Sequence, residues 1–128
     1  MDLSPFFKSI IDQDPMPVVI CDLNNIIVYM NPAAVENYDD EGGEKLVGLL
    51  IFDCHSHASV EKIDRVVKWF AQSPDNNIMH TFYNEKKCKD GYMVALRDDD
   101  GRLIGYYEKH ELRKRDETPF YGGHGSVR

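Results

Sequence analysis

Apolar residues recur at helical spacing near the start of the chain and predict a first short helix. The apolar positions of this helix are Phe6, Phe7, Ile10 and Ile11. Ser4 is placed to cap the helix, and Pro5 suits the first helical position, where its missing amide hydrogen would have no partner. Residues 14–17 contain two prolines, so we expect the helix to end there.

Two short runs of apolar and β-branched residues follow and predict a β-hairpin. Residues 18–22 and 26–30 are the strands, and residues 23–25 form the turn, because Asn tolerates a left-handed backbone. Asn31 and Pro32 come directly after the second strand. Asn is a favoured N-cap and Pro a favoured first helical residue, so a short helix is expected over residues 33–38.

The middle of the chain contains the strongest helical pattern. Residues 58–72 carry one apolar stripe, with charged residues on the other faces of the helix. The members of the stripe are Val60, Ile63, Val66, Val67 and Phe70. Upstream of this helix, residues 39–43 predict a loop and residues 44–50 a helical turn. Residues 51–57 are too mixed for an assignment.

The last third of the sequence predicts an antiparallel meander. Its three strands are residues 78–84, 88–97 and 103–110. Asp90 and Gly91 indicate a turn or bulge inside the second of them. We expect one domain over residues 1–111, followed by a tail over residues 112–128 that is mobile or docks on a partner.

Two strands before the helices and three after them can share one sheet. The expected fold is therefore α+β, a five-stranded antiparallel sheet with short helices packed on one face. The space between sheet and helices is the default ligand site. Alternation along the strands predicts that Ile78, His80 and Phe82 share a face. The residues expected to line the pocket are Ile20, Phe52, Ile63, Val67, Phe70, His80, Phe82, Met93 and Ala95.

Charge and cysteine usage narrow the function classes. The chain has 15 Lys and Arg against 22 Asp and Glu, a net charge of −7, which argues against nucleic-acid binding because that needs a basic surface. No apolar run is long enough to cross a bilayer, and the N-terminus resembles no secretion signal, so we expect no membrane partner. Three widely spaced cysteines argue against disulfides and favour a cytoplasmic location.

The element order and three local motifs resemble the PAS (Per-Arnt-Sim) sensory domain. The first motif is the hairpin of residues 18–30 followed by Asn31, and the second is Leu46-Val47-Gly48. The third is the last hairpin, which contains Asp100-Gly101. The resemblance covers roughly residues 4–111. It implies a signal-sensing or protein-interaction module, often dimeric, that holds heme, flavin, a metabolite or no ligand.

A fourth motif is similar to a bacterial subgroup of PAS domains often fused to hemerythrin-like domains. Members of that subgroup carry Cys-His followed by two prolines, one residue and Ser. Here Cys54-His55 is followed by Ser56 and His57 where the prolines usually stand. The resemblance implies no assigned role for this motif.

The histidines suggest two specific ligands, heme and a metal ion. Heme requires an axial ligand, most often His, in an apolar slot, and His55, His57, His80 and His110 are the candidates. His55 and His57, with Cys54, could instead hold a metal shared across a dimer, although a closed zinc site needs four ligands. The cysteine segment of the light-sensing, flavin-binding PAS branch is absent, so we expect no flavin photochemistry.

We therefore expect a stand-alone sensory module rather than an enzyme. It would bind a small ligand, with heme as one candidate, between the sheet and the helices. It would form a homodimer and signal to a separate partner protein. One alternative is a ligand-free interaction or dimerisation module. A second is a small enzyme that uses the cavity for proton transfer, with Asp22 or Asp53 as the base.

Overall fold

The computed structural model describes residues 1–54 and 57–121, with residues 53, 54 and 57 described by their backbone alone. The elements in chain order are α1 (Ser4–Asp12), β1 (Val18–Asp22), β2 (Ile27–Met30), α2 (Pro32–Asn37), the 3-10 turns η1 (Asp39–Glu41), η2 (Gly43–Leu46) and η3 (Ile51–Cys54), α3 (His57–Gln72), β3 (Ile78–Asn84), β4 (Lys89–Arg97) and β5 (Leu103–Leu112). No helix in this part of the chain is long and apolar enough to span a bilayer.

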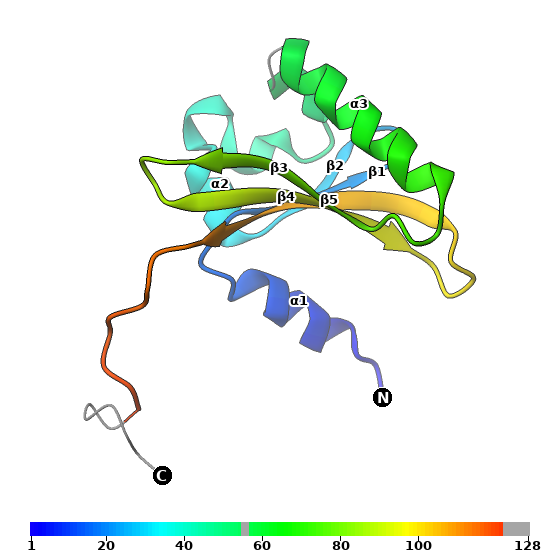
Figure 1. The fold of residues 1–128 in the computed structure, drawn as a ribbon. Helices are drawn as coiled ribbons and strands as arrows, with labels where there is room; N and C mark the ends of the chain where they lie inside the picture. The colour runs from blue at the N-terminus through cyan, green and yellow to red at the C-terminus, as the bar shows by residue number, and fades with distance from the viewer. Residues whose placement is uncertain (55–56, 122–128) are drawn as a thin grey trace.

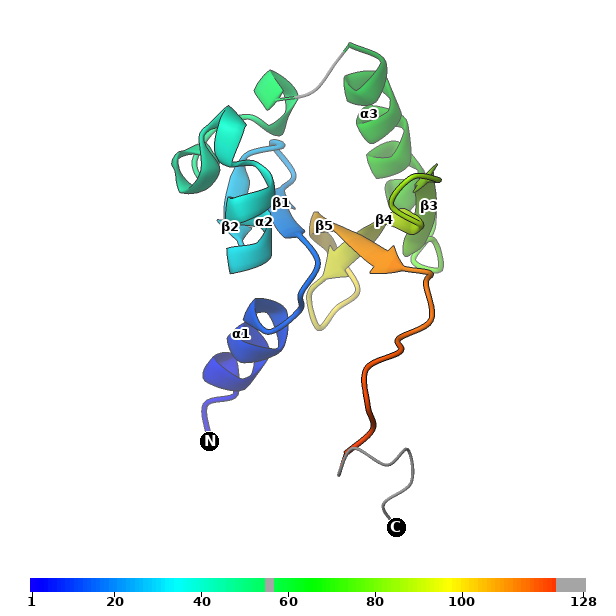
Figure 2. The ribbon, with the colours of Figure 1, turned by 90° about the vertical axis from the view of Figure 1, so that its left-hand side faces the viewer.

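The five strands form one antiparallel sheet in the order β2-β1-β5-β4-β3 (Figure 1). The last strand, β5, therefore lies in the centre, between one strand from the first hairpin and one from the second. The helix α3 crosses one face of the sheet, which we call the inner face (Figures 1 and 2). The expected α+β class and five-stranded sheet are confirmed.

The hydrophobic core lies between the inner face and the helices. The stripe of α3 contributes Ile63, Val66 and Phe70, and Phe70 is fully buried. The sheet contributes alternate residues of its strands, as the period of two requires. The core comprises Val19, Cys21, Ile27, Met30, Ala34, Leu46, Ile51, Ile63, Val66, Phe70, Met93 and Tyr106.

The first helix, α1, lies on the opposite side of the sheet, which we call the outer face (Figure 1). A groove of about 380 Å³ separates the apolar side of α1 from the outer face of β1 and β5. Phe6, Phe7 and Ile10 of α1 are more than half exposed. The sequence predicted this amphipathic helix, but Ser4 does not cap it: the Asp2 carboxylate accepts a hydrogen bond from the Ser4 amide instead.

Asn31 joins the first four elements. Its buried side-chain oxygen accepts hydrogen bonds from the amides of Val18 and Ala34, both at 2.9 Å. The second of these is the predicted N-cap of α2. Its side-chain nitrogen donates to the carbonyls of Ile11 and Met16, so the end of α1 is fixed to the start of the sheet.

Candidate functional site: a cavity between the long helix and the sheet

A cavity of about 200 Å³ lies where the sequence placed the ligand site. The inner faces of β3, β4 and β5 form its floor, and the first half of α3 forms its roof. Its described lining residues are Tyr38, Ser59, Lys62, Ile63, Thr81, Phe82, Tyr92, Met93, Glu108, Lys109 and His110. The volume is below the roughly 300–1,000 Å³ typical of pockets for drug-sized ligands, so only a small molecule fits.

A β-bulge in β3 brings Phe82 to the cavity. His80 is paired with Tyr92, but Phe82 is paired with Gly91, so one residue of β3 is unpaired between them. The bulge places Phe82 on the inner face above Gly91, where a Cβ would overlap its ring. Gly91 therefore makes room for Phe82. The sequence predicted a turn or bulge at Asp90 and Gly91 of β4, but the bulge is in the neighbouring strand β3.

His110, which lines the cavity, forms a polar pair with Lys89, which lines a neighbouring groove beside α2. The Lys89 ammonium donates to Nδ1 of His110 at 3.1 Å, and the His110 ring packs edge-on against Phe82. A neutral ring that accepts at Nδ1 carries its proton on Nε2. Burial, and then the charges of Lys89 and Lys87, lower the pKa of His110 to about 4, so the ring is neutral at pH 7.

The helix side of the cavity carries a second cation. Lys62 of α3 donates from Nζ to the Thr81 carbonyl of β3 at 2.8 Å, which ties roof to floor. An ammonium has three donor hydrogens, so this bond leaves donors for another group. Glu108 is the one acidic side chain among the described lining residues.

The predicted pocket residues divide into three groups. Ile63, Phe82 and Met93 line the cavity. Phe52, Val67, Phe70 and Ala95 belong to the core or pack against it. Ile20 lies on the outer face and lines the groove beside α1, so its assignment to the pocket is wrong. The cause is the register of β1: Cys21 faces inward opposite Tyr106, and its neighbour Ile20 must face outward.

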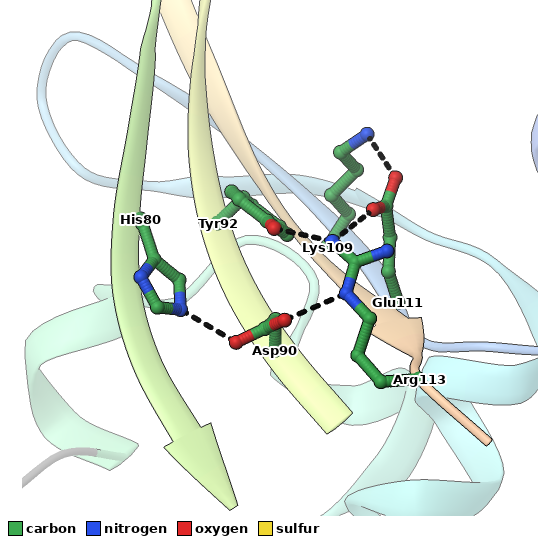
Figure 3. Close-up of polar contacts among 6 residues, drawn as sticks. All are labelled: His80, Asp90, Tyr92, Lys109, Glu111 and Arg113. Carbon is green, nitrogen blue, oxygen red and sulfur yellow. Dashed lines mark hydrogen bonds and ion pairs between the residues drawn. The ribbon is translucent and has the colours of Figure 1, made fainter. Parts of the chain in front are cut away.

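His80 also lies on the outer face, and its expected position in the pocket is wrong. Period two fails there because the bulge separates His80 from Phe82. The ring is about half exposed, and Nε2 donates to Asp90 at 2.7 Å (Figure 3). Arg113 donates to the same carboxylate and lowers the pKa of Asp90, with His80 adding to this effect. His80 is thus engaged in a surface network away from the cavity.

The Tyr92 ring is the centre of that surface network. The Arg113 guanidinium donates to the Tyr92 hydroxyl and pairs with Glu111 at 2.8 Å (Figure 3). Lys109 pairs with Glu111 at 3.0 Å, and its ammonium lies 5.6 Å from the Tyr92 ring centre. These charged groups pair with one another on the outer face. None of them belongs to the Lys89–His110 pair.

The other candidate ligands do not gather into a site. His55 lies outside the described residues, and His57 is described only by its backbone, as the first residue of α3. Among the described side chains, no three His, Cys, Asp or Glu come together to hold a metal ion. Asp22 accepts hydrogen bonds from the amides of Asn24 and Ile26 in the β1–β2 turn, so it is no base for the cavity.

The described cavity does not fit heme. A heme macrocycle is larger than most drug-sized ligands, yet the cavity is smaller than their usual pockets. His110 lines the cavity, but Nδ1 accepts from Lys89 and Nε2 therefore carries the hydrogen, so neither ring nitrogen offers a lone pair to iron.

The sequence analysis named His110 as a candidate heme ligand but did not include it among the pocket residues, and it did not name Lys62 at all. The signal for His110 was present in β5: Tyr106 is fully buried, and His110 lies four residues further along the same face. Lys62 precedes Ile63 on α3, and its charge favoured a solvent-facing assignment. Its stem lies along the cavity while its ammonium reaches β3, as long cationic side chains commonly do.

Comparison with solved structures identifies the architecture. A PAS domain from Colwellia psychrerythraea superposes with a TM-score of 0.65 at 14% sequence identity, covering 87% of this chain and 97% of that one. This is a PAS fold. A C-terminal domain from Streptococcus mutans shares the fold with a TM-score of 0.65 at 18% identity, over 84% of this chain and 83% of that one.

A third structure with the PAS fold is from the Aer2 receptor of Vibrio cholerae, which is a dual PAS–heme oxygen sensor. It matches with a TM-score of 0.52 at 18% identity, over 74% of this chain and 91% of that one. No protein-family model and no curated protein matches the sequence. The hairpin and Asn31 motifs thus predicted the PAS fold correctly. The sequence identities are too low to assign the ligand of any of these structures to this chain.

Proposed function

We propose that the chain is a ligand-sensing module with the PAS fold. It binds a small molecule in the cavity between α3 and the sheet and passes the change in packing to a separate partner protein. The observation that carries this proposal is the lining of the cavity: apolar walls from Ile63 and Met93 stand beside the polar groups of Lys62 and His110. That combination is typical of sites that bind and orient a ligand.

The cavity suits a switch because its walls belong to different layers. A ligand that contacts Lys62 and His110 at once touches both α3 and β5. It would compete for Lys62 with the hydrogen bond to the Thr81 carbonyl, and would thereby change the packing of α3 against β3. Ligand affinity that differs between the two arrangements is what converts binding into a signal.

A matched pair of variants on α3 tests the proposal. Ser59→Leu adds a bulky side chain to a residue that lines the cavity, whereas Ala58→Leu adds the same side chain at an exposed neighbour. The measurement is an NMR screen of ¹⁵N-labelled protein against small metabolites. We expect ligands that shift amides of residues 59–63 and 108–110 in the wild type and in Ala58→Leu, and no such shifts in Ser59→Leu.

Ligands that bind Ser59→Leu as tightly as the wild type would place the site elsewhere. A hemin titration belongs to the same experiment. Because the described cavity does not fit heme, we expect no Soret shift that depends on His80 or His110, and the ligand would be a colourless metabolite.

A second candidate function, homodimerisation, is favoured by the exposed apolar residues of α1. Phe6 and Ile10 are 56% and 70% exposed and lie next to each other on α1, and Ile10 also lines the groove along the outer face. A second copy of the chain could cover both, because isolated apolar surface of this kind favours an interface. Light scattering should show a dimer for the wild type and a monomer for Phe6→Ser combined with Ile10→Ser.

The matched control for the dimer is Ser9→Ala on the same helix, which should leave the mass unchanged. A monomeric wild type, or a double variant that stays dimeric, would contradict the use of α1 as the interface. Ligand binding in the cavity is measured independently of this outcome.

A further inference from the structure

Among the described residues, Lys89 is a buried cation without an ion-pair partner. It begins β4 on the inner face, and 8% of the residue is exposed. Its one side-chain partner within the described residues is His110, and no carboxylate there lies within ion-pair distance of it. Burial, and then the nearby charge of Lys87, lower the pKa of Lys89. A buried ammonium is costly unless an opposite charge compensates it.

His110 connects this charge to the cavity. Nδ1 of the ring accepts from Lys89, and the ring itself is part of the cavity lining. The remaining polar atom of the ring, Nε2, carries a hydrogen and is the donor available to a ligand. A ligand acceptor bonded to Nε2 would be separated from the Lys89 ammonium by the imidazole ring alone.

The other charges around the cavity set the charge of its ligand. Lys62 on the α3 side is cationic and uses one donor on the Thr81 carbonyl. Glu108 is the one acidic group among the described lining residues. The other cation of the lining, Lys109, pairs with Glu111 on the outer face. Lys62 in the lining and Lys89 behind His110 therefore stand against the one carboxylate of Glu108, so the surroundings favour one additional negative charge and disfavour two.

We propose that the cavity binds a small monocarboxylate, whose carboxylate accepts from His110 and compensates the charge of the Lys89–His110 pair. This proposal rests on the ligand-sensing function argued above and names the class of its ligand. The apolar remainder of the molecule would lie against Ile63, Phe82 and Met93.

Binding should then take up a proton. His110 lies next to Lys89 of β4 and near Lys87 of the β3–β4 turn, Glu108 is two residues away on the same face of β5, and Lys62 lies on the α3 side of the cavity. In these surroundings the ring stays neutral at pH 7. A carboxylate next to the ring favours the imidazolium, since opposite charges at contact distance stabilise each other. The proton is taken up at Nδ1, so it replaces the hydrogen bond that this atom accepts from Lys89. Affinity should therefore rise as the pH falls from about 7.5 to about 5.5, where a simple carboxylate is still ionised.

Propanoate, propanamide and succinate are the probes. Propanoate and propanamide have nearly the same shape and differ in charge, and succinate adds a second charge. NMR titration of the full chain, following residues 108–110, gives the three dissociation constants. We expect propanoate to bind at least about tenfold more tightly than propanamide, and more tightly than succinate.

Two lysine variants test the role of the buried charge. Lys89→Met keeps an apolar stem and removes the ammonium, whereas Lys86→Met removes the same charge from the exposed β3–β4 turn. Propanoate affinity should fall about tenfold in Lys89→Met and stay unchanged in Lys86→Met. His110→Gln keeps a hydrogen-bond donor but has no titrating ring, so this variant should still bind propanoate but lose the pH dependence. It tests the proposal even if Lys89→Met does not fold.

Equal affinity for propanoate and propanamide, or equal affinity of the two lysine variants, would overturn the proposal. If only uncharged molecules shift the cavity amides, the sensing function stands and the monocarboxylate is wrong. If a broad screen finds no small molecule that shifts them, the sensing function itself fails.

Discussion

At the scale of single residues, Asn31 has the clearest structural role. Its side chain joins α1, β1 and α2 through hydrogen bonds that are all buried or partly buried. Asn31→Ala should lower the free energy of unfolding by about 3 kcal/mol, because it leaves several buried groups unsatisfied and removes an N-cap. Urea unfolding measures this loss.

The control for Asn31 is Asn24→Ala in the exposed β1–β2 turn, expected to change stability by less than about 0.5 kcal/mol. Hydrogen exchange adds a local readout, since α1 should lose protection first when its link to Asn31 is gone. Equal stability of the two variants would contradict the assigned role.

His110 makes stability depend on pH in a defined window. Its pKa falls from an ordinary 6.5 to about 4 on folding, so between these values the unfolded chain holds a proton that the folded protein lacks. Stability is therefore full above about pH 6.5 and decreases as the pH falls toward 4, by about 1–2 kcal/mol after allowance for the exposed part of the ring. Urea midpoints measured across this range test the slope.

His110→Gln should flatten that slope, and His80→Gln should leave it in place because His80 lies in the surface network. A slope that persists in His110→Gln would assign the proton to another group.

At the scale of elements, Arg97 fixes the C-terminal end of α3 to β4. Its guanidinium donates to the carbonyls of Phe70 and Ser73 and, through Nε, to the side chain of Asn77. Arg97→Met should lower stability by about 2–4 kcal/mol, because the Phe70 carbonyl and the Asn77 side chain lose this donor and the Ser73 carbonyl keeps only the Asn76 amide. Arg97→Lys should recover little, since one ammonium cannot reach the acceptors that a planar guanidinium spans.

The matched control is Arg102→Met, which removes the same charge from the exposed β4–β5 turn. Thermal unfolding of the three variants ranks them. An Arg102 variant as unstable as the Arg97 variant would show that net charge, rather than this joint, is responsible.

The elements were predictable from the sequence because each is fixed by local signals. Asn31-Pro32 starts α2 and the apolar stripe of residues 58–72 forms α3, as expected. The pocket was less predictable, because it depends on which strand contains a bulge. Nothing in residues 78–84 signals an unpaired residue. The space that this bulge in β3 requires is in the partner strand β4, where Gly91 leaves room for the Phe82 ring.

At the scale of the whole molecule, the two faces of the sheet have different chemistry. The inner face carries the cavity and, behind His110, the buried Lys89, whereas the outer face carries α1, its groove and the paired charges around Tyr92. The proposed ligand and the proposed second copy would therefore bind to opposite faces and would not exclude each other. Sequence periodicity supplied the two faces, and the register of β1 and β3 decided which histidines and aliphatic residues belong to each.

The central position of β5 has a consequence for how the chain folds. Each hairpin can form as soon as its own residues are made, but β1 and β4 find their shared neighbour only when residues 103–112 have left the ribosome. Until then two strand edges stay open to other chains, which invites misassembly. Pairing between residues nearly ninety positions apart also slows folding. We infer that synthesis of this protein passes through a vulnerable interval that ends with its last strand.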